Sequence, residues 1–68
     1  MVENKQRICD FLVIALRETR NLADLQALDY DAQHEVVTAT FADGAKKYAN
    51  VAMDSGTSMI RDIIIQIV

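Results

Sequence analysis

The sequence predicts a small α+β domain in the order α-β-β-β-α, with a three-stranded antiparallel meander and both helices packed on one face. Two local signals and a change of pattern predict this fold. Asp43-Gly44 is typical of a tight chain reversal, and Asp54-Ser55-Gly56-Thr57 is typical of a helix start. Around these signals the apolar spacing changes between the periods of a helix and a strand. The 68 residues are interpreted as one domain, 1–68.

Residues 4–20 are predicted to form the first helix. Its core-facing side is expected to carry residues at helical spacing: Ile8, Phe11, Leu12, Ala15 and Thr19. Further apolar residues widen the arc: Cys9, Val13, Ile14 and Leu16. Arg17 and Arg20 suit the last turn, and Asn21 suits the C-cap. Because so wide an apolar arc is usually covered on two sides, we expect another subunit to supply the second cover.

Two strands are expected before the Asp-Gly turn. Leu25–Asp31 fits either a helix or a strand, and we favour a short strand because the polar residues 31–35 read as a turn leading into a clear strand. Val36–Ala42 is that strand, since it is rich in β-branched residues.

The hairpin around Gly44 has two possible registers. A two-residue loop would mix polar and apolar residues on each face. A three-residue loop, 42–44 with Gly44 in a bulge, pairs Val37 with Ala49 and Glu35 with Val51. This register is preferred because it gathers one apolar face: Val37, Ala39, Phe41, Ala49, Val51 and Met53.

A second helix is predicted from an N-cap at Asp54 or Ser55 to about Ile67. Its core-facing side is expected to contain mostly isoleucines: Met59, Ile60, Ile63, Ile64 and Ile67. Ile65 falls on the outer side, which indicates a partner surface.

Composition narrows the function classes. The formal net charge is −3, which argues against nucleic acid as a partner because affinity for phosphates comes mainly from clustered Lys and Arg. The longest apolar run, Phe11–Leu16, is far below the ~20 residues that span a bilayer, and the polar start lacks the pattern of a signal peptide. We therefore expect a cytoplasmic protein without a membrane partner.

The chain offers few residues for covalent or metal chemistry. Cys9 is the only cysteine, so no internal disulfide is expected, and it is interpreted as a small core residue. His34 is the only histidine and has no cysteine partner for a zinc site. The acidic residues around it are interpreted as a solvated turn: Asp29, Asp31 and Glu35. No metal and no cofactor are expected.

Asp54-Ser55-Gly56-Thr57-Ser58 resembles the active-site loop of aspartic peptidases, with apolar flanks at 51–53 and at Ile60. The resemblance implies that Asp54 shares a proton with a partner aspartate and activates water, with Gly56 and Thr57 fixing the carboxylates. It also implies a dimer, as in retroviral peptidases. The chain is shorter than those enzymes and has no glycine-rich flap. We therefore favour a helix cap, and keep an Asp54-based enzyme as the alternative.

Lys46-Lys47-Tyr48-Ala49-Asn50 resembles a lysine run of double-stranded-RNA-binding domains, which have the same element order. The resemblance implies contact of these lysines with RNA phosphates. In that family the run opens the last helix, whereas here it directly follows the hairpin turn. We therefore favour lysines that keep a strand edge soluble. An anion site at residues 55–57 is disfavoured as well, because Asp54 places negative charge there.

Residues 50–64, following an Asp-Gly hairpin, resemble short prophage and mobile-element proteins of gut bacteria. This resemblance implies no activity. We expect a non-catalytic domain that binds protein and works as a homodimer or small oligomer. The expected interface consists of Val13, Leu16, Ile65 and Val68.

Overall fold

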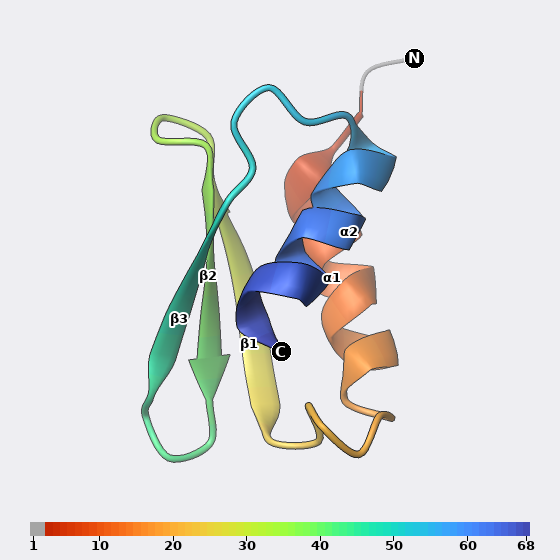
Figure 1. Cartoon of the computed structure of the whole chain (residues 1–68), viewed down its shortest axis with the longest axis vertical. Helices are drawn as coiled ribbons and strands as arrows, with labels where there is room; N and C mark the ends of the chain where they lie inside the picture. The colour runs from red at the N-terminus through yellow and green to blue at the C-terminus, as the bar shows by residue number, and fades with distance from the viewer. Residues whose placement is uncertain (1–2) are drawn as a thin grey trace.

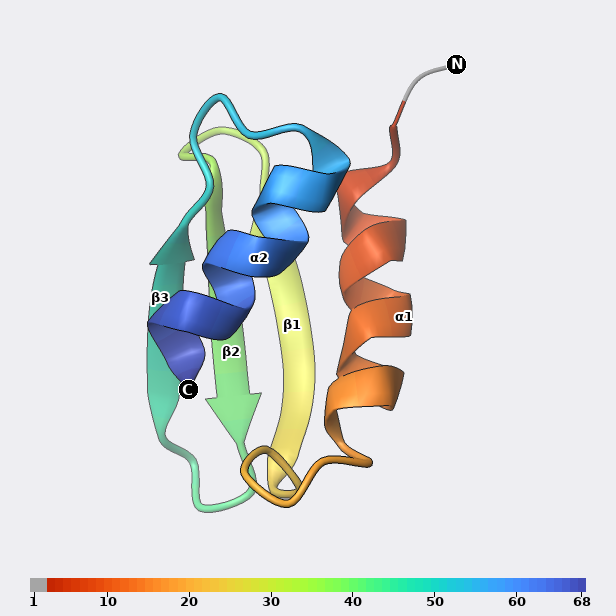
Figure 2. The same ribbon diagram turned by 45° about the vertical axis from the view of Figure 1, so that its right-hand side comes forward.

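Two helices lie on the same face of a three-stranded antiparallel sheet in the computed structural model, which describes residues 3–68 (Figures 1 and 2). The elements are α1 (Lys5–Leu16), β1 (Leu25–Asp31), β2 (Val36–Phe41), β3 (Lys46–Asn50) and α2 (Gly56–Ile67). The strands pair in the order β1-β2-β3. α1 packs mainly on β1, and α2 packs mainly on β3. The predicted fold class, including the strand at 25–31, is confirmed.

The β2–β3 hairpin has the predicted three-residue loop. Val37 pairs with Ala49, and the Phe41 amide donates to the Ala45 carbonyl at 2.9 Å. Gly44 has φ +87°, a left-handed conformation that glycine adopts without steric cost. The register therefore places Val37, Ala39, Phe41, Ala49 and Val51 in the core, as the face pattern predicts.

The turn between β1 and β2 is organised by Asp31. Its Oδ1 accepts hydrogen bonds from the amides of Gln33 and His34, and its Oδ2 lies 2.7 Å from His34 Nδ1. Hydrogen bonding to His34 holds the pKa of the Asp31 carboxyl below its usual range. The acidic residues here thus shape an exposed turn, as expected.

α1 is shorter than the predicted helix 4–20. It ends at Leu16 with Arg17 as the C-cap, so Asn21 does not cap it. The Thr19 hydroxyl donates to the Leu16 carbonyl at 2.6 Å and accepts from the Leu22 amide at 3.3 Å. The Thr19 side chain thus supplies hydrogen bonds to a carbonyl and an amide that would bond within the helix if it continued. The chain can then turn and bury Leu22 in the core.

The buried stripe of α1 also differs from the predicted one. Cys9 and Leu16 are buried, whereas Phe11 and Ala15 are exposed. Leu16 is therefore a core residue, and little of its side chain is available to the interface for which it was predicted. In this orientation of the helix, Gln6 forms two hydrogen bonds with the backbone of β1. The predicted core face of α1 points partly toward α2 instead of the sheet.

The connection from β3 to α2 gives two further findings. Met53 was expected on the inner face, but it is 94% exposed with φ 62°. The strand ends at Asn50, whose side chain accepts the Ala52 amide at 2.9 Å and turns the chain away from the sheet. Of the two predicted caps, Ser55 is the N-cap of α2, since its hydroxyl accepts the Ser58 amide at 3.3 Å.

The core is formed between the sheet and the inner sides of both helices. Its members are apolar and come from every element: Cys9, Leu16, Leu22, Leu25, Leu28, Val37, Ala39, Phe41, Ala49, Val51, Met59, Ile63 and Ile67. Burial raises the pKa of the Cys9 thiol to about 11, with smaller contributions from Asp10 and Asp29. Because the thiolate is the reactive form, Cys9 behaves as an inert core residue at neutral pH.

Candidate functional site

An apolar groove lies between the two helices on the outer side of the molecule. It has a volume of about 320 Å³ and is lined by Ile8, Phe11, Leu12 and Ile60. These four residues come from the sides of α1 and α2 that face each other. The Phe11 side chain is 61% exposed, and the Arg7 guanidinium carbon lies 5.6 Å from the centre of its ring. In the groove, part of the apolar arc of α1 is left uncovered.

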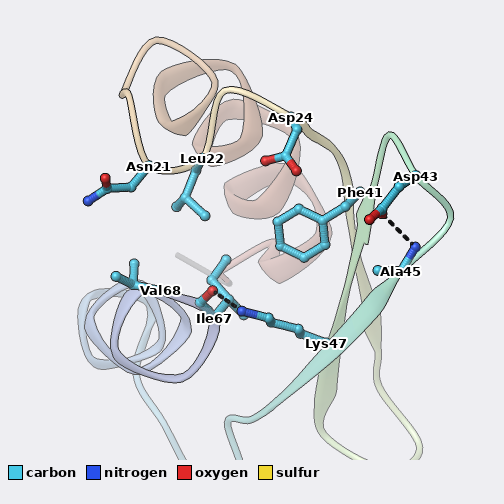
Figure 3. Close-up of a pocket in the computed structure, with 9 residues that line it drawn as sticks. All are labelled: Asn21, Leu22, Asp24, Phe41, Asp43, Ala45, Lys47, Ile67 and Val68. Carbon is cyan, nitrogen blue, oxygen red and sulfur yellow. Dashed lines mark hydrogen bonds between the residues drawn. The ribbon is translucent and has the colours of Figure 1, made fainter.

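A second hollow opens at the end of the sheet, beside the C-terminal end of α2 (Figure 3). Its volume is about 350 Å³. Apolar and polar side chains share its walls: Asn21, Leu22, Asp24, Phe41, Asp43, Ala45, Lys47, Ile67 and Val68.

Two of the polar side chains of this hollow, those of Lys47 and Asp43, are engaged within the chain. The Lys47 ammonium donates to the Ile67 carbonyl at 3.2 Å, and it lies 5.7 Å from the centre of the Phe41 ring. Asp43 Oδ1 accepts the Ala45 amide at 2.9 Å (Figure 3). Since these charges already hold the hairpin and the end of α2, the hollow is a weaker binding candidate than the groove.

The start of α2 brings acidic side chains together. Glu3 Oε2 accepts the Gly56 amide at 2.8 Å, so a carboxylate occupies the position that an external anion would take. Sequence reasoning placed the negative charge at this helix start on Asp54 and missed Glu3, which is 53 positions from Gly56. A Cβ at Gly56 would collide with the Glu3 carboxylate. A side chain at position 56 would therefore displace the Glu3 carboxylate from its present position.

Asp54 lies beside a second carboxyl group, that of Asp62 in the same chain. A hydrogen bond with Asp62 raises the pKa of Asp54 from its model-compound value of 3.8, and burial and repulsion by Asp62 add to the shift. Lys5 and Arg61 oppose it. When Asp54 is ionised it has no proton to donate, and its Oδ2 is shielded from solvent without a hydrogen-bonding partner among residues 3–68.

We expect this carboxyl pair to make stability depend on pH. A folded-state pKa above the unfolded value contributes stability that is fully present below about pH 3.8 and is lost as the pH rises through the folded pKa. Asp54→Asn removes the ionisation, so its stability relative to the wild type should increase from pH 3 to pH 7. Urea unfolding at a series of pH values measures the difference.

The control for this pH series is Asp31→Asn. The pKa of Asp31 is lowered in the folded state, so its contribution has the opposite sign: it is present above about pH 3.8 and lost on acidification. Asp31→Asn should therefore lose stability relative to the wild type as the pH rises. A constant difference between Asp54→Asn and the wild type across the series would contradict the assignment.

Each edge of the sheet is partly covered by a glutamine side chain from a helix. Gln6 of α1 donates to the Leu28 carbonyl at 3.2 Å and accepts the Tyr30 amide at 2.8 Å. Gln66 of α2 accepts the Asn50 amide at 2.9 Å and donates to the Asn50 carbonyl at 3.0 Å. Each glutamine side-chain amide thus pairs with outward-facing backbone groups as a neighbouring strand would, and it protects that part of the sheet edge. The sequence carried no signal for these contacts.

The predicted interface residues differ in exposure. Ile65 and Val68 are exposed, Val13 is half-buried against the core, and Leu16 is buried. Lys46 and Lys47 lie on β3, at the sheet edge, as the strand interpretation predicts. The large exposed apolar side chains of α1 are those of Phe11 and Ile14, and sequence reasoning had placed Phe11 in the core.

Two further results concern ligands and membranes. Within residues 3–68, no three His, Cys, Asp or Glu side chains come together in a way that could hold a metal ion. None of the helices in that part of the chain has the length and apolar character needed to cross a lipid bilayer.

Comparisons with protein-family models, with curated proteins and with solved structures gave no match. The resemblance of residues 50–64 to mobile-element proteins therefore stays a prediction. The functional argument rests on the groove, the hollow and the edges described above.

Proposed function

We propose that this protein is a non-catalytic interaction domain that binds a second copy of itself through the groove between α1 and α2. The observation that carries the proposal is the exposed Phe11 side chain, which lines an apolar groove together with Ile8, Leu12 and Ile60. A large aromatic side chain exposed beside other apolar groups is typical of a protein-binding surface.

A second copy suits this surface because the surface contains both a projecting ring and a groove. In a two-fold symmetric dimer the same patch meets itself, so Phe11 of each protomer can pack against Ile8, Leu12 and Ile60 of the other. The solvent-exposed surface of the Phe11 ring would then be buried in the interface. Burying a Phe side chain contributes roughly 1.5–3 kcal/mol, and the two-fold axis doubles the contact.

The size of the chain also supports self-association. A core in a chain of this length rarely supplies more than ~3–5 kcal/mol, and no disulfide is available from one cysteine. A standard interface covers about 800 Å² of each partner, or roughly a sixth of the 4611 Å² exposed here. The outer sides of both helices around the groove, and not the groove alone, would have to take part.

The test compares two glutamate substitutions on α1. Phe11→Glu puts a charge into the groove, whereas Ile14→Glu puts the same charge at a side chain that is equally exposed (63%) but does not line the groove. We expect the wild type and Ile14→Glu to elute as dimers in size-exclusion chromatography with light scattering, and Phe11→Glu to elute as a monomer.

Two results would overturn the proposal. A wild type that stays monomeric at the highest attainable concentration excludes self-association by any surface. A Phe11→Glu variant that stays dimeric, with unchanged circular dichroism, places the interface elsewhere.

A further inference from the structure

The outer edge of β3 is covered unequally along its length. The backbone of β3 bonds to β2 at alternate residues, as shown by Val51 donating to Glu35 and Phe41 donating to Ala45. In an antiparallel pair this alternation turns the amide and carbonyl groups of Lys46, Tyr48 and Asn50 outward. Gln66 takes both groups of Asn50, which leaves those of Lys46 and Tyr48 open to solvent.

The open part of the edge is also positively charged. Lys46 and Lys47 lie on opposite faces of β3, and both are exposed. Within residues 3–68, the Lys47 ammonium donates to the Ile67 carbonyl, whereas the Lys46 ammonium has no hydrogen-bonding partner. The chain as a whole carries a net charge of −3, so this edge is a basic segment on an acidic protein.

We propose that the outer edge of β3, from Lys46 to Tyr48, binds an extended acidic segment of another protein as an added antiparallel strand. The four outward backbone groups supply hydrogen bonds, which is how strand addition gains affinity. An acidic residue opposite Lys46 forms a cross-strand pair of opposite charge. β3 and α1 lie on opposite sides of the molecule (Figure 2), and the inference does not depend on the self-association proposed above.

A second copy of this chain is a poor occupant of the same edge. Pairing Lys46 with Lys46 of the other copy opposes two like charges, and shifting the register to pair Lys46 with Tyr48 opposes the two Lys47 side chains. The register centred on Tyr48 pairs Lys46 with Asn50, whose backbone groups Gln66 already holds. The β1 edge offers no alternative at Leu28 and Tyr30, where Gln6 is bonded.

The experiment uses the whole chain, labelled with nitrogen-15, and a capped peptide of alternating threonine and glutamate. The expected result is a set of chemical-shift changes confined to residues 46–50 and their neighbours on β2, with slower hydrogen exchange at the amides of Lys46 and Tyr48. A peptide of alternating threonine and lysine serves as the charge control and should give no such changes.

Two variants of one residue separate backbone pairing from side-chain contact. Tyr48→Pro removes the outward amide without removing a bond to β2, since proline is tolerated where the amide of an edge strand faces solvent. Tyr48→Thr removes the ring but keeps the amide. We expect Tyr48→Pro to weaken binding about five-fold or more, in line with the loss of one hydrogen bond, and Tyr48→Thr to bind nearly as the wild type does.

Several outcomes overturn the proposal. The first is that the acidic peptide leaves hydrogen exchange at the Lys46 and Tyr48 amides unchanged. The second is that the lysine peptide causes chemical-shift changes as large as those with the acidic peptide. The third is that exchange at these amides slows in the protein alone as its concentration rises, which assigns the edge to a second copy. The exchange measurement on the wild type decides the question even if Tyr48→Pro does not fold.

Discussion

Replacing Ile63 with alanine is expected to lower the free energy of unfolding by about 2–5 kcal/mol. Ile63 lies on α2, has no exposed surface and packs in the centre of the core. The loss combines the transfer free energy of the removed carbons with the cavity that remains, because close-packed neighbours relax only partly. In a chain of 68 residues this is a large share of the total stability, which is typically ~3–10 kcal/mol at this length.

Ile65→Ala is the matched control for this substitution. It makes the same chemical change in the same helix, but the Ile65 side chain is 65% exposed. We expect a change within about 0.5 kcal/mol, as for surface positions in general. Urea unfolding of both variants at one fixed chain concentration measures the difference, since self-association makes apparent stability depend on concentration. Equal losses in the two variants would contradict the packing of α2 described here.

Replacing Gln6 with alanine is expected to lower stability by about 1–3 kcal/mol. The substitution leaves the Leu28 carbonyl and the Tyr30 amide without their partner at a half-buried position. Alanine is the better helix former, so the intrinsic preference of α1 acts in the opposite direction and cannot explain a loss. The expected cost arises from unsatisfied groups at the β1 edge.

Hydrogen exchange gives this prediction a readout specific to the edge. The Tyr30 amide should exchange faster in Gln6→Ala than in the wild type. The exchange rates of β2 amides that bond within the sheet should change only as far as the free energy of global unfolding changes. Gln66→Ala is the comparison, since its two bonds to Asn50 are exposed and their loss should cost less. A Tyr30 amide that is equally protected in Gln6→Ala would show that Gln6 does not guard the edge.

Much of the fold could be predicted from short-range patterns. The register of the β2–β3 hairpin follows from placing Val37 and Ala49 on one face with Gly44 in the turn, and the structure has that register. The N-cap of α2 was narrowed to Asp54 or Ser55 because both side chains can accept the first free amides. These features depend on residues only a few positions apart, or on a strict two-residue period.

The apolar spacing of α1 gave a wrong prediction of its buried residues, because spacing within one helix does not specify which apolar residues its neighbours cover. The spacing predicts Phe11 in the core, yet so wide an apolar arc is compatible with more than one orientation of the helix. In the observed orientation Cys9 is buried and Gln6 bonds to β1. The groove that supports the proposed function is the part of the arc left over. Its existence depends on the separation of two helices, which a pattern within one helix does not contain.

By itself, the sequence determined the order of the elements, the register of the β2–β3 hairpin and the region where α2 begins, because local hydrogen bonding and alternation of side chains specify them. The tertiary structure alone decided the pairing of Gln6 with β1, of Gln66 with Asn50 and of Glu3 with Gly56. Those contacts join residues 16 to 53 positions apart. Their geometry depends on how helices and sheet pack together, and no local preference of the chain encodes it.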